Sequence, residues 1–262
     1  MKFTRELNAV IAIAGREVMN VVRQPQYLIF MFVFPLIFIG LLGGMLSQNL
    51  GQGLGFDLMR FIFIGMLVNN IYQTTMNGVT SLIEDRENGF TQEMFVAPVS
   101  RYSVILGKVL GSGIMSIVTL VSIFLVALVM GVSISLSDVG HILLIAPIIA
   151  LSGAALGIFF IGFVRSPKMA DIGSFLLIFP QLFLSGAMIP VHNSSGFLNW
   201  LVHAMPMTYL IDLAHHIFYA GNAALQTIVA RPVWIDLLVT AGIFLAFIFV
   251  GTHMFTRAER NR

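Results

Sequence analysis

The chain has 262 residues, of which 58% are hydrophobic and only 10% are Asp, Glu, Lys or Arg. Soluble domains carry about 25% charged residues, so this composition excludes an ordinary soluble protein and predicts an all-α membrane protein with a single domain, residues 1–262. The net charge of +2 comes from basic residues beside apolar runs, which indicates membrane topology and not nucleic-acid binding. The chain has no cysteine, which excludes disulfides and thiolate metal sites.

Residues 1–25 are predicted to form an amphipathic helix on the membrane surface. Apolar side chains recur at helical spacing on one face, but Arg16 and Glu17 interrupt the run and make burial in hydrocarbon unfavourable. The same charges argue against a cleaved signal peptide. Pro25 ends the helix, because proline lacks the amide donor and clashes with the preceding turn. An ordinary packed amphipathic helix is the alternative interpretation.

Six apolar runs follow, each close to the ~20 residues that a membrane-spanning helix needs. They are 27–46, 61–83, 104–130, 142–164, 172–190 and 233–255. All basic residues except Arg60 and Arg231 fall in the segments on one side of these runs. Because basic residues concentrate on the cytoplasmic side, both termini are predicted to be cytoplasmic, in a multi-pass protein of the cell inner (cytoplasmic) membrane.

The second run is the most polar of the six. Asn69, Gln73 and Asn77 stand at i, i+4 and i+8, and Asn70 and Thr74 form a neighbouring stripe. Amides that face lipid leave donors and acceptors unsatisfied, so this face is expected to point at protein or at a wet path. Two interpretations stay open, namely hydrogen bonding between helices and the lining of a translocation path.

Two further features concern the packing of the spans and the outer side. The pairs Gly40 with Gly44 and Gly153 with Gly157 allow helices to approach closely, in one chain or across a dimer. The longest connection, 191–231, is rich in aromatic residues that suit the headgroup layer, and its apolar stretches are too short to span. We expect short external half-inserted helices in this connection.

The sequence contains no motif for catalysis or metal binding. Its six histidines are scattered, without the spacing of a paired-ligand site. Gly107 and Lys108 lack the preceding glycine of a phosphate-binding loop, and no serine-hydrolase motif appears. An intramembrane enzyme would need a nucleophile and a base beside the amides of the second run, and neither is evident. The chain is predicted to be no enzyme by itself and to hold no cofactor or metal.

Charge is concentrated in the segment that begins at Glu84, where seven of the residues from 84 to 108 are charged. A charged loop between two spans predicts a docking site for a partner, and a solvated loop without a partner is the alternative. Pro98 followed by Ser100 predicts a break and a cap for the next helix. A short charged helix held between two spans can transmit a partner's motion to them.

Nine residues of this segment form a characteristic pattern: Glu84, Glu87, Gly89, Glu93, Pro98, Ser100, Arg101, Gly107 and Lys108. They resemble the loop after the second span in membrane subunits of ATP-binding-cassette exporters of the second type. A second block shows a Pro…Ser-Gly…Pro order and then a Pro-x-Thr-Tyr turn, at Pro180, Ser185, Gly186, Pro190, Pro206 and Tyr209. It resembles the fifth span of the same family together with the turn after that span.

The chain departs from the family pattern at several positions. Phe90 stands where the family often has threonine, and Glu93 is four residues after Gly89 instead of three. His215 and His216 stand where an arginine is often found. Members that export drugs, lipids or polysaccharides differ in such details, so the subfamily stays open.

The resemblance implies a permease with partners. A separate nucleotide-binding ATPase subunit would bind ATP and Mg and couple to the loop 84–101, and a second permease copy, identical or closely related, would complete the path within the lipid bilayer. The substrate would be an amphipathic drug-like or lipid-like molecule moved outward. A polysaccharide or teichoic-acid exporter is the alternative within transport, and a membrane scaffold or assembly protein is the alternative outside it.

The expected sites follow from the pattern and the resemblance together. The residues expected to couple to the ATPase are Glu84, Glu87, Gly89, Glu93, Pro98 and Arg101. Those expected to line the translocation path are Asn69, Asn70, Gln73, Thr74 and Asn77. Those expected to form an external gate are Pro180, Ser185, Gly186, Pro190, Pro206 and Tyr209.

Overall fold

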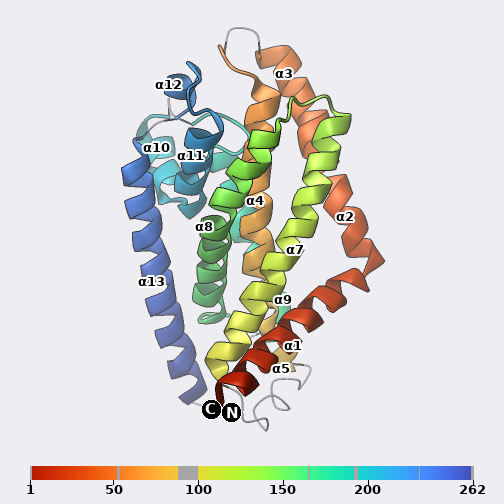
Figure 1. The fold of residues 1–262 in the computed structure, drawn as a ribbon. Coiled ribbons are helices and arrows are strands. Elements are labelled where there is room, and N and C mark those ends of the chain that lie inside the picture. The colour runs from red at the N-terminus through yellow and green to blue at the C-terminus, as the bar shows by residue number, and fades with distance from the viewer. Residues whose placement is uncertain are drawn as a thin grey trace.

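The computed structural model describes residues 2–51, 54–87, 100–164, 166–191, 194–229 and 231–260. All regular secondary structure within these ranges is helical, and the long helices run side by side along a common direction (Figure 1). The predicted all-α class is confirmed.

The helices in chain order are α1 (Lys2–Val22), α2 (Pro25–Pro35), the π-helix η1 (Leu36–Gly43), α3 (Gly44–Leu50), α4 (Leu58–Thr80), α5 (Leu82–Glu87), α7 (Arg101–Val129), α8 (Leu136–Ile161), α9 (Pro167–Leu184), α10 (Gly196–Ala204), α11 (Pro206–Phe218), α12 (Leu225–Ile228) and α13 (Val233–Arg260).

Four stretches of helix within the described ranges are long and apolar enough to cross a membrane. They are Ile29–Asn49, Ser103–Val129, Leu136–Ile161 and Val233–Met254. The first is built from α2, η1 and α3, which follow one another without a break. The other two predicted spans correspond to α4 and α9, which lie in the same bundle but are less apolar (Figure 1). Length and composition therefore support four spans, and six remains a hypothesis.

Helix α4 lies at the centre of the bundle. It packs against α7, α8 and α11, and most of its residues from Leu58 to Thr80 are buried. Small residues of α8 allow it to approach α4 closely. A Cβ at Gly153 would collide with the carbonyl oxygen of Tyr72, and a Cβ at Gly157 with that of Met76. Protein surrounds most of α4, and this explains how it tolerates amides and threonines that lipid would not.

Helix α1 packs obliquely along the first half of α7 (Figure 1). Gly107 and Gly111 of α7 admit this contact, since a Cβ on either would meet atoms of α1 at less than 3 Å. The side of α1 that faces α7 is buried and consists of Val10, Ile13, Ala14 and Glu17. A second apolar side, which includes Leu7, Ile11, Met19 and Val22, is exposed. The helix is thus packed on protein and still offers an apolar surface that suits lipid.

Most helix boundaries agree with the apolar runs, with one clear exception. Pro25 opens α2 after α1 has ended at Val22, as predicted. The run 172–190 was expected to be one span, but α9 ends at Leu184. Gly186 has a φ of 89°, a left-handed conformation that ends the helix and that glycine adopts without strain. Hydropathy could not detect this turn, because the residues around it remain apolar.

The two ends of the chain lie at the same end of the bundle, next to α1 and α5, and α3 and α12 lie at the opposite end (Figure 1). An even number of crossings follows from this arrangement if the bundle spans a membrane. We call the end with α1 and α5 the α5 end, and the opposite one the α12 end.

Candidate functional site

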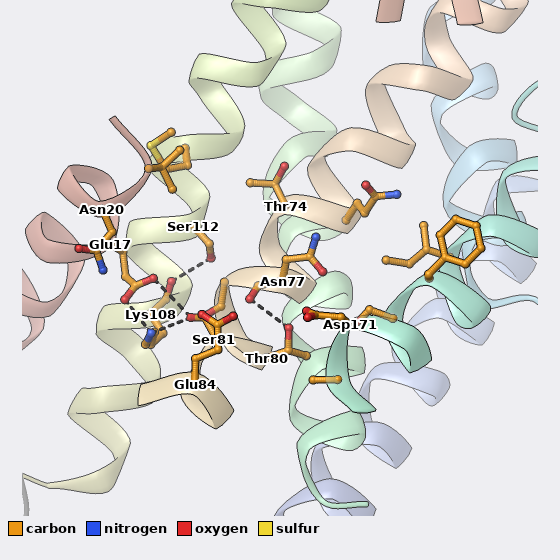
Figure 2. A pocket seen from close by; sticks show the side chains of 18 of the residues that line it. Glu17, Asn20, Thr74, Asn77, Thr80, Ser81, Glu84, Lys108, Ser112 and Asp171 are labelled. Carbon is orange, nitrogen blue, oxygen red and sulfur yellow. Dashed lines mark hydrogen bonds and ion pairs between the residues drawn. The ribbon is translucent and has the colours of Figure 1, made fainter. Parts of the chain in front are cut away.

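A cavity of about 630 Å³ lies towards the α5 end of the bundle, among α1, α4, α5, α7 and α9 (Figure 2). Its size falls within the range of small-molecule sites, about 300–1,000 Å³. The cavity has a polar wall, an apolar wall and a group of buried charges at one side.

The polar wall comes from α4. Gln73, Thr74 and Asn77 line the cavity, and no side-chain hydrogen bond is found for any of the three within the described part of the chain. Thr74 is buried, Gln73 is half-buried and Asn77 is exposed. Buried polar groups in proteins are nearly always hydrogen-bonded, so the hydroxyl of Thr74 in particular is suited to water or a ligand in the cavity.

The other two residues of the predicted path lie elsewhere. Asn69 is 1% exposed, and its amide donates to Sδ of Met207 in α11 at 3.6 Å. Asn70 donates to the backbone oxygen of Met66 at 2.9 Å. Four residues of an α-helix turn about 40° more than one full revolution. Side chains at i, i+4 and i+8 therefore point in successively different directions around the helix. This is why Asn69 contacts a different neighbour from Asn77.

The apolar wall comes mainly from α9. Ile178 and Leu182 are buried there, and Phe175 and Phe179 also line the cavity. Phe34 of α2 adds a third aromatic ring. The cavity is thus amphipathic, with amides and a hydroxyl on α4 and hydrocarbon and rings on the facing wall.

Buried charges close one side of the cavity. Nζ of Lys108 in α7 lies 2.6 Å from Oε1 of Glu17 in α1 and 2.5 Å from Oδ2 of Asp85 in α5, and it donates to Oγ of Ser81 at 2.7 Å. Nη2 of Arg16 lies 2.7 Å from the other oxygen of Asp85. We call Arg16, Glu17, Asp85 and Lys108 the charge cluster.

The cluster is electrically balanced, which explains how it stays buried. The Lys108 side chain is 1% exposed and that of Asp85 is 9% exposed. Burial would raise the pKa of Asp85, but the hydrogen bond from Arg16 and the charge of Lys108 outweigh this effect, so the pKa is lowered from 3.8. Each charge is compensated by an opposite one, and α1, α5 and α7 are held together.

A second contact of α1 holds the start of α7. Oε2 of Glu6 accepts hydrogen bonds from Oγ of Ser103 at 2.6 Å and from the backbone amide of Ser100 at 3.0 Å. These bonds, that of Ser103 first, lower the pKa of Glu6. Ser100 is itself the N-cap of α7, and its Oγ accepts from the amide of Ser103 at 3.1 Å, as the sequence predicted.

The residues predicted to couple to the ATPase are distributed around these contacts. Glu84 lies in α5 and lines the cavity, and Glu87 is exposed at the end of α5. Arg101 is the first residue of α7. Gly89, Glu93 and Pro98 lie outside the described residues.

Sequence reasoning missed the charge cluster as a site. It used Arg16 and Glu17 only as evidence against burial in lipid, and Lys108 only as part of a motif. A lysine within an apolar run, together with charges that interrupt an apolar helix face, was the signal available. The pairing could not be predicted, because the partners lie far apart in the sequence.

The residues predicted as an external gate gather towards the α12 end. The backbone of Ala187, just after Ser185 and Gly186, lies directly on Gly65 of α4, where a Cβ would collide with it. Ser185 donates to the backbone oxygen of Gln181. The side chain of Gln181 in turn accepts from the amide of Met207 at 3.3 Å and so links α9 to α11.

The prolines and the tyrosine of the gate prediction frame the same region. Pro180 lies inside α9, Pro190 follows the turn after α9, and Pro206 is the first residue of α11. The hydroxyl of Tyr209 donates to the backbone oxygen of His203 at 2.9 Å and fastens α11 to α10. Helix α11 contacts both α9 and α10 in this region, and the opening of this region as a gate stays a prediction.

The two basic residues assigned to the outer side are both paired with acidic partners. Arg60 lies 2.8 Å from Asp138. Arg231 lies 2.9 Å from Asp212, and its guanidinium also lies 4.9 Å from the ring centroid of Tyr209. These pairs are structural and fix α8, α11 and the start of α13.

Comparison with known families agrees with these observations. The family described as ABC-2 type transporter matches residues 8–219, which include the cavity and the charge cluster. None of the curated proteins matches the chain. Membership implies partnership with an ABC ATPase subunit and a multi-pass location in a membrane, and permeases of this family are generally not catalytic themselves. The resemblance seen in the sequence is confirmed, and the chain belongs to the ABC-2 type transporter family as a membrane subunit of an ABC transporter.

Proposed function

We propose that this chain is the permease of an exporter in the cytoplasmic membrane, which moves an amphipathic drug-like or lipid-like molecule outward. Two copies, or this chain with a close paralogue, enclose the path. Separate ATPase subunits bind at the α5 end, which is cytoplasmic in this proposal. ATP and Mg are bound by those subunits.

One observation carries the proposal: the cavity and the anchor of the charged loop share residues. Glu17, Asp85 and Lys108 line the cavity and also hold α5, which leads into that loop. A rigid-body shift of α5 therefore changes the cavity wall directly. Such a mechanical connection is what a transporter driven by a separate motor requires.

Helix α1 extends this connection to the other end of the loop. It holds α5 through Arg16 and the start of α7 through Glu6. Both flanks of the loop are thus tied to one rigid helix. A force on the loop is transmitted to α1, α4 and α7 together.

The roles of individual residues follow from this arrangement. In the proposal, Glu84, Glu87, Glu93 and Arg101 contact or orient the ATPase. Gln73, Thr74 and Asn77 line the path. The segment 191–219 closes its outer end.

The chemistry of the cavity favours an amphipathic substrate over a polysaccharide. Its α9 wall presents phenylalanine, isoleucine and leucine side chains, and its α4 wall presents amides. The buried Ile178 and Leu182 offer hydrocarbon contact, which the hydroxyl groups of a polysaccharide or teichoic acid cannot use. The scaffold alternative gives no reason for a cavity of this size beside the loop anchor.

The decisive experiment is co-purification. The chain is expressed with the ATPase encoded nearest to it, and the complex is solubilised in mild detergent. Its subunit stoichiometry and ATP hydrolysis are then measured. The native protein is compared with Glu87→Ala and with Thr227→Ala, a control at an exposed position in α12. We expect a two-plus-two complex whose yield or coupled hydrolysis falls in Glu87→Ala only. A stable permease that never retains an ATPase would favour the scaffold.

A further inference from the structure

We infer that the cavity at the α5 end selects a lipophilic cation, with Glu84 and Asp171 as the residues that recognise its positive charge. This inference deepens the proposed function and rests on it for the direction of transport. Binding itself can be measured on the permease alone.

The described cavity lining carries more negative than positive charge. Four carboxylates line it, those of Glu17, Glu84, Asp85 and Asp171, against one ammonium, that of Lys108. Glu17 and Asp85 are compensated within the charge cluster. Glu84 and Asp171 have no ion pair in the part of the chain that the structure describes. Two negative charges therefore remain for a ligand.

The two uncompensated carboxylates come from different elements. Glu84 lies in α5, below Ser81 and Lys108 in the view of Figure 2, and Asp171 comes from the first half of α9. A ligand between them meets negative potential from both sides. Both side chains are exposed, so a ligand in the cavity can reach their carboxylates.

The polar wall points to a ligand independently of the charges. Thr74 is only 8% exposed, and among the described residues no group forms a hydrogen bond with its hydroxyl. Thr74 lines the cavity together with Gln73 and Asn77, and Figure 2 shows Thr74 and Asn77 on the same helix. A polar group held this deep without a partner is rare unless water or a ligand completes it.

Aromatic rings in the cavity suit the apolar part of such a ligand. Phe34, Phe175 and Phe179 line the cavity, and ring faces attract cations as well as hydrocarbon. A hydrophobic cation can pack on the aromatic rings and at the same time bind the carboxylates through its charge. A hydrated metal ion would use the carboxylates and leave the rings without a role.

An anionic ligand is disfavoured by the same geometry. Lys108 is the one basic side chain in the described lining, and its ammonium already has Glu17, Asp85 and Ser81 within 2.7 Å. An anion would have to displace one of these partners and would then face Glu84 and Asp171.

The test compares two probes of nearly the same shape and opposite charge, tetraphenylphosphonium and tetraphenylborate. Binding to the permease in phosphatidylcholine nanodiscs is measured by equilibrium dialysis, and binding to empty nanodiscs is subtracted. We expect saturable binding of tetraphenylphosphonium and none of tetraphenylborate. The double variant Glu84→Gln/Asp171→Asn should weaken phosphonium binding on the order of tenfold, because two charges near the ligand are removed.

Glu87→Gln is the matched control, since it removes the same charge from α5 at a position outside the cavity lining. Its phosphonium affinity should stay within about twofold of native, as expected for a screened surface charge. Phe179→Ala should weaken phosphonium binding while the charges remain. Size-exclusion profiles show whether each variant folds.

Two results would overturn the inference: equal saturable binding of both probes, or unchanged phosphonium affinity in a folded double variant. Neither result bears on whether the permease retains an ATPase. Failure of charge selection and failure of the proposed function are therefore distinguishable.

Discussion

The ammonium of Lys108 in α7 lies 2.5 Å from the carboxylate of Asp85 in α5, although the lysine side chain is only 1% exposed. An uncompensated charge at such a position would cost several kcal/mol. The pair therefore fixes the distance between the two helices that flank the charged loop. Any motion of α5 has to carry α7 with it or break the pair.

Replacing Lys108 by methionine should destabilise the protein strongly. The substitution keeps most of the side-chain volume and leaves Glu17 and Asp85 without their shared cation, at a cost of about 3–5 kcal/mol. The measurement is thermal unfolding in detergent. Lys168→Met, which removes an exposed lysine at the start of α9, is the control and should change Tm little. Equal Tm values for both variants would show that the cluster is not what holds α5.

Gly65→Ala should destabilise the contact between α4 and the turn after α9. Its Cβ would collide with the backbone of Ala187, and overpacking of this kind costs about 1–3 kcal/mol. Gly44→Ala makes the same change where no atom lies within 4 Å of the new Cβ, so it should be neutral or stabilise by up to about 1 kcal/mol. Denaturation of both variants tests this contrast, and a neutral Gly65→Ala would contradict the close approach.

The carboxylate of Glu6 should stabilise the folded protein at neutral pH, and this contribution should disappear in acid. The folded-state pKa of Glu6 lies below its ordinary 4.5, so its contribution is present above that value and is lost as the pH falls through the folded-state pKa. Gln at this position keeps an acceptor but loses the charge. The Tm of Glu6→Gln should therefore lie below native at pH 7 and approach it on acidification. A gap that is independent of pH would rule out the charge as its origin.

Substitution by leucine should have different effects at two asparagines of α4. Asn77 lines the cavity, so Asn77→Leu should reduce stimulation of ATP hydrolysis by tetraphenylphosphonium in the complex without lowering Tm. Asn69 is buried, and its Oδ1 has no hydrogen-bond partner among the described residues. Asn69→Leu removes an unsatisfied acceptor at similar volume and should be near neutral for both quantities. The reverse pattern would place the path on the other side of α4.

Replacing Glu87 and Glu93 by alanine should uncouple transport from ATP hydrolysis. Both residues belong to the proposed contact with the ATPase, and we expect membrane insertion to stay intact without them. Transport into inverted vesicles and membrane yield are measured together. Unchanged transport at normal yield would remove these residues from the mechanism.

Much of the fold could be predicted, because apolar runs and their breakers are local signals. Pro25 and Ser100 mark helix starts that are evident from the sequence alone. The end of α9 could not be found in the same way, since a single glycine with positive φ ends an apolar run that continues to residue 190. Hydropathy measures composition and not backbone conformation.

The site was predicted only in part. Three of the five path residues line the cavity, and the drift of the helical row explains why Asn69 does not. The charge cluster depends on contacts between α1, α5 and α7, which no periodicity encodes. Asp171 stands at the end of an apolar run and gave no signal of a site, and only the packing of α9 brings it to the cavity.

The contacts of α1 also bear on how the chain is made. Arg16 and Asp85 are 69 positions apart, and Lys108 follows later still. During synthesis, α1 leaves the ribosome before α5 and α7, which carry Asp85 and Lys108, have been made. An amphipathic segment that can rest on the bilayer surface during this interval is therefore suited to biogenesis as well as to the finished protein.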